Sequence, residues 1–424
     1  MTTWVFLAVL FVGIALGVPI SFALGAAAIA MILVMDVSFA ILVEQGIRGV
    51  NSFPLLAIPF FILVGEIMSS GGLARRLVAF AQALVGFITG GLGQVNVAAS
   101  MFFGGISGSA VADTSAIGGI MIGPMKEQGY TGGHATAITV SSSVIGIIIP
   151  PSIPLILYGI VTNTSIGQLF LAGIVPGIII GVALMFTTYL TARKLPGGAR
   201  QPFSLSALVS SFKDAVLGLV LPLIIIGGIL AGVFTATEAA VAAVAYALIV
   251  SLLVYRELHL RDLWPILIRT GRLTGMVLFL LAVATSVAYL LTTAGVPRQI
   301  VEATSSVSSN PYVLLGLVMV VLLVIGVVMD LTPAMIILAP ILTPVVTEVG
   351  VPPVYFGVLM SLVLGIGLIT PPVGTCLYVG CAVGKVTMEE LLARMWPFYL
   401  ALLSVIAILI AVPDLVTWLP DAAP

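Results

Sequence analysis

Charged residues are scarce in this chain. Its 424 residues include 15 Lys and Arg and 16 Asp and Glu, so the formal net charge is only −1. A soluble domain carries about one charged residue in four, whereas 61% of this chain is apolar. A soluble fold could not cover so much apolar surface, and a protein that binds nucleic acid needs a basic face for the phosphates. The composition therefore excludes both classes. It predicts contact with a lipid bilayer and no nucleic acid partner.

Cysteine and histidine are scarcer still. The chain has two of each, namely Cys376 and Cys381, and His134 and His259. Zinc, haem and iron–sulfur centres take their ligands mainly from these residue types. No pairing of a nucleophile with a base is evident either. We therefore expect neither an enzyme nor a resident cofactor.

The apolar residues form long runs, which Gly and Pro interrupt more often than charge. Runs of this length are typical of membrane-spanning helices, and the chain has room for roughly ten to thirteen of them. The first run, residues 4–35, lacks a basic region before it and is too long for a cleaved signal peptide, so it is predicted to be the first transmembrane helix. We predict an all-α polytopic protein that forms a single integral membrane unit over residues 1–424.

Two polar stretches, residues 193–213 and 256–272, are rich in Lys and Arg. Basic loops usually face the cytoplasm, so both stretches are predicted to lie on that side. The two apolar segments between them, at about 213–256, are predicted to form a connecting helical hairpin. Charges elsewhere are too sparse to indicate sidedness.

The two halves of the chain resemble each other at a spacing of 221 residues. This spacing relates Pro150-Pro151 to Pro371-Pro372, and the segment 69–75 resembles 292–298 at a spacing of 223. We predict an internal, inverted repeat, with one copy at about 54–192 and the other at about 277–412. Repeats with segments broken by Gly and Pro are typical of secondary transporters. Helices in a membrane break only where protein, water or an ion replaces the lost backbone hydrogen bonds.

Residues 103–119 are small and rich in hydroxyl groups, and they include Ser107, Ser109 and Asp113. The flanking apolar stretches are too short for two full spans, which predicts a re-entrant helical hairpin. Hydroxyl and carbonyl oxygens at its turn suit a hard cation such as Na⁺. The alternative is close helix packing through small residues, but the carboxylate favours a functional site.

In the second half, Asp330 ends a long apolar run that begins at Tyr312 and precedes Thr332 and Pro333. We interpret Asp330 as the repeat counterpart of Asp113. The alternative is a helix N-cap at the membrane surface, because Asp before Thr-Pro is also a good helix start.

The double prolines remove backbone donors and force the preceding residue out of the helical region. Each pair is predicted to divide a span into two half-helices, whose ends can face ions; an ordinary kink is the alternative. Two further carboxylates, Glu66 and Glu238, lie in or near apolar helices. Either is a proton site or a helix-end residue paired with a backbone group.

At these motifs the chain resembles the large membrane subunit, or DctM-like permease, of tripartite ATP-independent periplasmic (TRAP) transporters. The matching segments are 58–66, 107–114, 149–159, 329–333 and 368–374.

The resemblance implies Na⁺-driven symport of a carboxylate-containing solute across the cytoplasmic (inner) membrane of a bacterium or archaeon. It implies two partner proteins, a separate small membrane subunit (DctQ-like) and a periplasmic solute-binding protein (DctP-like). It also implies an elevator mechanism, in which hairpins at about 95–125 and 331–346 move together with the two broken helices.

The resemblance further suggests site residues. The expected Na⁺ ligands are Ser107, Ser109, Gly146, Asp330, Thr332, Gly367 and Thr370. The expected substrate-binding residues are Ser109, Asp113, Thr114, Pro150, Pro151, Pro371, Pro372, Gly374 and Thr375. A carboxylate usually calls for an Arg or a helix N-terminus. The sequence places no Arg evidently at this site, so we expect selectivity to lie in the soluble partner.

Three alternatives stay open at this point. A self-sufficient Na⁺- or H⁺-coupled carboxylate symporter of the same repeat design would need no partner proteins. A passive channel would show neither saturation nor dependence on an ion gradient. A purely structural membrane subunit would not need carboxylates within apolar segments.

Overall fold

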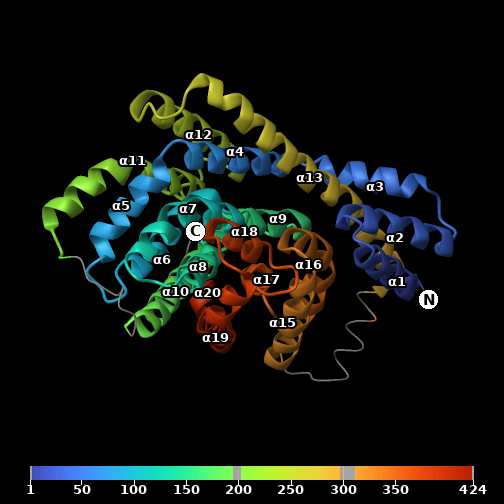
Figure 1. Ribbon diagram of the computed structural model, residues 1–424. Coiled ribbons are helices and arrows are strands. Elements are labelled where there is room, and N and C mark those ends of the chain that lie inside the picture. Colours follow the sequence, from blue (N-terminus) through green and yellow to red (C-terminus); the bar gives the residue numbers. More distant parts are fainter. Residues whose placement is uncertain (1, 194–201, 297–298, 300–310, 423–424) are drawn as a thin grey trace.

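The structure is a computed structural model that describes residues 2–193, 202–296, 299 and 311–422. The regular structure of this described part is helical (Figure 1), which confirms the predicted all-α class. Eight of its helices are long and apolar enough to cross a membrane, and five further apolar helices are shorter. Most of the polar stretch at 193–213 that was predicted to be cytoplasmic, and residues 297–298 of the second related segment, lie outside the described residues.

The first apolar run forms two helices, α1 (Thr2–Ala15) and α2 (Ile20–Met35), where a single transmembrane helix was predicted. The break follows from Gly17, whose φ of +76° is accessible mainly to glycine, and from Pro19 before α2. The two helices pack closely against each other. A Cβ atom on Gly13 would lie 2.9 Å from that of Ala23.

An outer layer of helices runs along one side of the molecule and includes α3, α4, α12 and α13 (Figure 1). Helix α13 packs on α2, α3 and α4, and α12 packs on α4 and α11. The predicted connecting hairpin corresponds to α11 and α12, which the Tyr246 hydroxyl joins by donating to the Leu217 carbonyl at 2.7 Å. The bounds are α3 (Ala40–Val50), η1 (Phe53–Leu56), α4 (Ala57–Ser70), α5 (Leu73–Val85), α11 (Leu205–Leu230), α12 (Ala236–Ile249), its π-helical continuation η3 (Val250–Val254) and α13 (Leu260–Thr293).

The other helices form an inner bundle in which the two halves of the chain interlock. Helix α7 packs on α18, α8 on α19, and α9 on α16. The first half contributes α6 (Leu92–Ser107), α7 (Ala110–Glu127), α8 (Gly132–Ser143), η2 (Val144–Ile147), α9 (Ile153–Thr162) and α10 (Ile166–Ala192). The second half contributes α15 (Pro311–Val328), α16 (Leu331–Glu348), α17 (Pro353–Gly367), α18 (Thr375–Gly384), α19 (Met388–Ala411) and α20 (Asp414–Ala422).

Helix ends in the two halves correspond at the predicted spacing of 221 residues. Helices α7 and α16 match at both ends, and the starts of α8 and α17 match as well. The turns before α8 and α17 contain Gly129 and Gly350, with φ of +94° and +85°. The boundaries of the repeat itself, at about 54–192 and 277–412, stay a prediction.

Each half contains one helical hairpin and one helix that a double proline interrupts. The first hairpin, α6–α7, agrees with the predicted range of 95–125. The second consists of α15 and α16, so the predicted range of 331–346 covers only its second arm. Pro150-Pro151 separate η2 from α9, and Pro371-Pro372 separate α17 from α18; both Pro–Pro bonds are cis.

Candidate functional site

The turns of the two hairpins lie on one cavity of about 560 Å³. Helices α4 and α13 of the outer layer form the opposite wall. The hairpins contribute Ser107, Gly108, Ser109, Ala110, Val111, Ala112, Ser115, Asp330, Leu331 and Thr332. The outer layer contributes Ile62, Gly65, Glu66, Ser69, Ser70, Arg269, Leu273 and Val277. The cavity therefore brings together four residues predicted to bind Na⁺: Ser107, Ser109, Asp330 and Thr332.

The first turn is built from Ser107, Gly108 and Ser109. Gly108 has a φ of +60°, and a Cβ atom there would lie 2.8 Å from the Pro151 carbonyl oxygen, so only glycine allows this close approach. Ser109 is the N-cap of α7, where its Oγ accepts a hydrogen bond from the Ala112 amide at 3.4 Å. The Ser107 hydroxyl is buried and has no hydrogen-bond partner among the described residues. It is therefore free to bind a ligand in the cavity.

The second turn centres on Asp330, the N-cap of α16. Its Oδ1 accepts a hydrogen bond from the Leu331 amide at 2.9 Å. The Thr375 side chain lies close to this carboxylate, and its buried hydroxyl has no hydrogen-bond partner in the described part of the chain. The helix-start interpretation of Asp330 was thus correct, and the residue also lines the cavity.

The assigned repeat relation between Asp113 and Asp330 is wrong at the spacing that the helices follow. The residue 221 positions before Asp330 is Ser109, and both are N-caps of matching helices. Asp113 is fully buried and does not line the cavity. Its Oδ2 accepts a hydrogen bond from Ser100 Oγ at 2.7 Å, and Ser100 Oγ is 3.1 Å from Ser142 Oγ. Asp113 and its buried neighbour Thr114 therefore lie behind the hairpin turn.

The double prolines lie near the cavity but not on its wall. Around the breaks, the lining residues are Ile147, Ile153, Pro154 and Leu368. Pro150 and Pro151 are buried, whereas Pro371 and Pro372 are exposed. Neither Gly374 nor Thr375 lines the cavity, and the Thr370 hydroxyl donates to the Ile366 carbonyl at 2.7 Å.

Gly146 and Gly367 pack each broken helix against the first arm of its hairpin. A Cβ atom on Gly367 would lie 2.4 Å from the Gly326 carbonyl oxygen in α15. A Cβ atom on Gly104 in α6 would lie 2.6 Å from the Gly146 Cα. These backbones therefore touch, although neither Gly146 nor Gly367 reaches the cavity wall.

Arg269 is the residue of the cavity that sequence reasoning missed. Its Nε donates to Glu66 Oε2 at 2.7 Å, from α13 to α4. The sequence places Arg269 in a basic stretch that was assigned to the cytoplasmic surface, but it lies inside α13 and lines the cavity. Glu66 therefore pairs with a side chain, which neither of its two interpretations anticipated. A carboxylate without an evident partner in the apolar segment 58–66 was the signal that pointed to such a cation.

Glu238, in contrast, is a helix-end residue as one of its interpretations held. It forms a capping box with Thr235 at the start of α12: Thr235 N donates to Glu238 Oε2 at 2.8 Å, and Glu238 N donates to Thr235 Oγ1 at 3.3 Å. Its carboxylate is thus used by the backbone.

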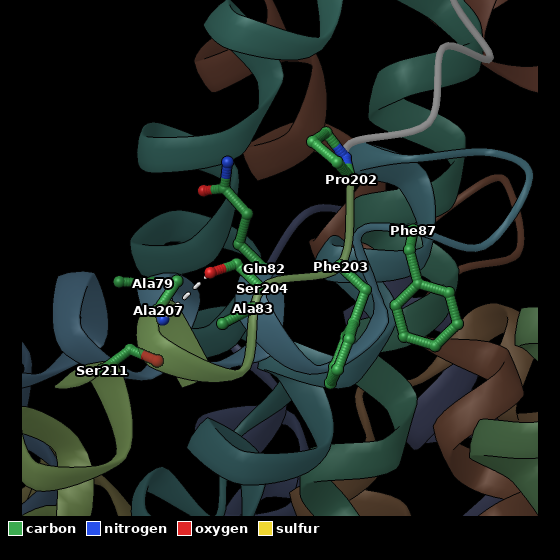
Figure 2. Close-up of a pocket in the computed structure, with 9 residues that line it drawn as sticks. All are labelled: Ala79, Gln82, Ala83, Phe87, Pro202, Phe203, Ser204, Ala207 and Ser211. Carbon is green, nitrogen blue, oxygen red and sulfur yellow. Dashed lines mark hydrogen bonds between the residues drawn. The ribbon is translucent and has the colours of Figure 1, made fainter. Parts of the chain in front are cut away.

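A second hollow of about 210 Å³ lies between α5 and the start of α11 (Figure 2). Phe87 and Phe203 close one side, with ring centroids 5.4 Å apart. The residues that line it are uncharged, and they include none of the predicted site residues. This hollow is therefore not the candidate site.

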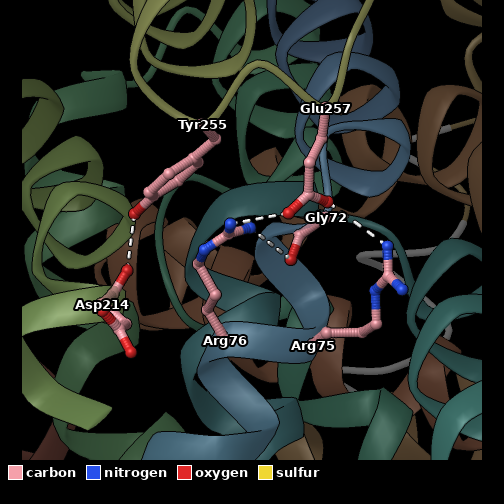
Figure 3. A network of polar contacts seen from close by, with 6 residues as sticks. All are labelled: Gly72, Arg75, Arg76, Asp214, Tyr255 and Glu257. Atoms are coloured by element: carbon pink, nitrogen blue, oxygen red, sulfur yellow. Dashed lines mark hydrogen bonds and ion pairs between the residues drawn. The ribbon is translucent and has the colours of Figure 1, made fainter. Parts of the chain in front are cut away.

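A polar cluster ties the α4–α5 break to the turn before α13 (Figure 3). Glu257 accepts from Arg76 at 2.6 Å and from Arg75 at 3.3 Å. The Arg76 guanidinium also lies 3.8 Å from the centre of the Tyr255 ring, and the Tyr255 hydroxyl donates to the Asp214 carbonyl at 2.7 Å. These contacts position α4, and with it Glu66, relative to α13.

The eight long apolar helices, the two hairpins and the polar cavity between them define a multi-pass membrane transport protein. The family model described as "Tripartite ATP-independent periplasmic transporter, DctM component" matches residues 7–415. The chain thus belongs to the DctM family of TRAP transporter large permease subunits, as its motifs predicted, and its relatives are transport proteins rather than enzymes.

Two relatives and one solved structure illustrate the match. The 2,3-diketo-L-gulonate TRAP transporter large permease protein YiaN of Escherichia coli is 41% identical over 419 residues, which are 98% of each chain. The sialic acid TRAP transporter large permease protein SiaM of Vibrio cholerae is 38% identical over 96% of this chain and 95% of its own length. The crystal structure of the Alcanivorax borkumensis YdaH transporter shares the fold alone, with a TM-score of 0.56 and 16% identity over 88% of this chain and 87% of that chain.

Proposed function

We propose that this chain imports a carboxylate-containing solute together with Na⁺ across the cytoplasmic (inner) membrane, as the large subunit of a three-component transporter. The charge of the cavity carries the proposal. The described residues that line it include two carboxylates, Glu66 and Asp330, and one guanidinium, Arg269. An anion that enters such a cavity meets a net negative wall unless a cation is bound with it. Coupling to Na⁺ removes this electrostatic penalty.

The oxygen groups at the two turns support Na⁺ as that cation. Leaving a buried hydroxyl without a hydrogen bond costs about 1–3 kcal/mol, and both Ser107 and Thr375 have such hydroxyls. A hard cation prefers oxygen ligands, and Asp330 and Thr332 add a carboxylate and a hydroxyl at the second turn. Carbonyl groups beside Gly146 and Gly367 complete the proposed ligand set, with Thr370 close to the second break.

The solute is proposed from the names of the relatives. One is a transporter of 2,3-diketo-L-gulonate and another of sialic acid, and both solutes are carboxylates. A cavity of about 560 Å³ is within the size range of small-molecule sites, which is roughly 300–1,000 Å³.

The arrangement of the helices is consistent with an elevator mechanism. The cavity lies between the hairpins on one side and α4 and α13 on the other. We propose that the hairpins and broken helices carry solute and ion along this outer layer, which a small membrane subunit extends. A periplasmic binding protein delivers the solute to the hairpins.

The test is uptake by proteoliposomes that hold this chain, its cognate small membrane subunit and its cognate binding protein. The solutes are 2,3-diketo-L-gulonate, sialic acid and succinate, with an inward Na⁺ gradient or a proton gradient. We expect saturable uptake of at least one solute that needs Na⁺ and all three proteins. Uptake by the chain alone would favour the self-sufficient symporter, and uptake without saturation would favour a channel.

A further inference from the structure

Arg269 has an unusual position for a basic residue in a membrane transport protein. It lies in the first third of α13, between apolar residues of the same cavity wall, Leu273 and Val277 among them. Among the described residues that line the cavity, Arg269 alone is basic. A guanidinium in such a place is costly unless it has a partner or a ligand.

The one partner of Arg269 in the described part of the chain is Glu66, which accepts its Nε–H. This single contact leaves both terminal Nη groups without a protein acceptor. The Arg269 side chain is 50% exposed and that of Glu66 is 26% exposed, so the guanidinium is more open to the cavity than the carboxylate that holds it. A guanidinium that is held by Nε presents its paired terminal N–H groups, a geometry that matches the two oxygens of a carboxylate.

We propose that Arg269 binds the anionic group of the transported solute when the solute occupies this cavity, and that Glu66 is a positioning residue for the guanidinium. The hydroxyls of Ser69 and Ser70 on α4 and of Ser107 and Ser109 on the first hairpin surround the rest of the solute. The inference rests on the proposed function in one respect, the anionic nature of the solute. It assigns part of the selectivity to this chain, whereas the sequence had left it to the soluble partner.

The experiment measures solute binding to the purified complex of this chain and its small membrane subunit in lipid nanodiscs with saturating Na⁺. The probes are 2,3-diketo-L-gulonate, sialic acid and succinate. Loss of a bidentate, charge-assisted contact predicts that Arg269→Gln weakens binding of the transported anion by about tenfold or more. Arg269→Lys keeps the charge and the bond to Glu66 but loses the planar fork, so it should fall between Arg269→Gln and the wild type.

A matched control is Arg272→Gln. Arg272 is exposed on the same helix, three residues further along, and does not line the cavity. Its substitution removes the same charge from α13 and should leave the affinity unchanged. Glu66→Gln should weaken binding by far less than Arg269→Gln, because the neutral side chain still accepts the Nε–H bond and no longer competes with the anion.

A second readout separates recognition from a structural role. The neutral primary amide of the transported acid should bind to the wild type and to Arg269→Gln with equal affinity. If Arg269 only supported the fold, the acid and the amide would be weakened together. That result would overturn the proposal, and so would unchanged affinity of Arg269→Gln for the acid or an equal loss in Glu66→Gln.

The proposal and the proposed function can fail separately. Sodium-driven uptake by the wild-type system, together with unchanged binding by Arg269→Gln, would reject only the role of Arg269. Absence of both uptake and binding for all three anions in the wild type would reject the carboxylate function and this inference with it.

Discussion

The turns of the two hairpins have the same construction and different charges. Ser109 and Asp330 are 221 residues apart, and each is the N-cap of an 18-residue helix in its half of the chain. The first cap is a neutral hydroxyl and the second is a carboxylate. The first half has its own acid, Asp113, but holds it behind the turn in a hydrogen bond with Ser100. The comparison teaches that related turns can divide the work: one supplies oxygen ligands, and the other also supplies the charge.

The two breaks differ in a similar way. In the first, the Ser152 hydroxyl donates to the Ile147 carbonyl at 2.6 Å and accepts from the Leu155 amide at 3.3 Å, so one side chain bridges the gap. In the second, the bridge is a backbone bond from Cys376 N to the Leu368 carbonyl at 3.0 Å. The first double proline is buried and the second is exposed. The first break therefore belongs to the packed interior and the second to a more open surface.

Removing the charge from the second turn should have the largest effect. We expect Asp330→Asn to fold and to lose most or all sodium-dependent uptake, because Asn can still cap α16 but cannot balance a cation. Initial uptake by the three-component system across a sodium series checks this. Asp36→Asn is a control that removes an exposed carboxylate far along the chain. Wild-type sodium dependence in Asp330→Asn would remove this residue from the mechanism.

Replacing a double proline by Ala-Ala should lower uptake by about tenfold or more, because restored helical hydrogen bonds would close the break. The protein should unfold at the same or a higher temperature, since an interior proline costs a helix about 3 kcal/mol. The first pair should have the larger effect, because Ile147, Ile153 and Pro154 around that break line the cavity. Normal uptake by both variants would mean that the prolines are ordinary kinks.

The two serines of the first turn should respond differently to alanine. Ser107 Oγ has no protein partner, so Ser107→Ala should raise the sodium concentration for half-maximal uptake by about three- to tenfold with little change in stability. Ser109 caps α7, so Ser109→Ala should also cost about 1 kcal/mol of stability. Sodium titration and thermal unfolding of both variants test this. Identical behaviour of the two variants would show that the capping bond is unimportant.

The smallest expected difference concerns Gly72 and Gly295, which occupy similar breaks before and after the connecting hairpin. Both have a φ of +73°, so alanine is strained at either position. A Cβ atom on Gly72 would also collide with Glu257, whereas that on Gly295 meets nothing within 4 Å. Gly72→Ala should thus be less stable than Gly295→Ala by about 1 kcal/mol, since it also disturbs exposed ion pairs. Thermal unfolding gives the comparison, and equal stability would mean that the Glu257 cluster adds nothing.

The sequence predicted the class, the breaks and one turn of the fold well, because these follow from local chemistry. Double prolines cannot continue a helix, and Ser107-Gly108-Ser109 in an apolar segment indicates a turn wherever the rest of the chain lies. It failed where the answer depends on packing. Nothing local to Asp113 shows that Ser100 satisfies it behind the hairpin, and nothing local to Arg269 shows that α4 brings Glu66 to it. The break at Gly17 was missed because the apolar pattern continues through it.

The central claim is that a bound cation makes the negative wall of the cavity acceptable to an anion. It is tested most directly by measuring the affinity of the wild-type complex in nanodiscs for the transported acid with and without Na⁺, and for ²²Na⁺ with and without the acid. Because linkage is reciprocal, each ligand must change the affinity of the other by the same factor. We predict that Na⁺ tightens binding of the acid by about tenfold or more, and that the acid tightens binding of Na⁺ equally. Affinity for the acid that is the same with and without Na⁺ would contradict the account.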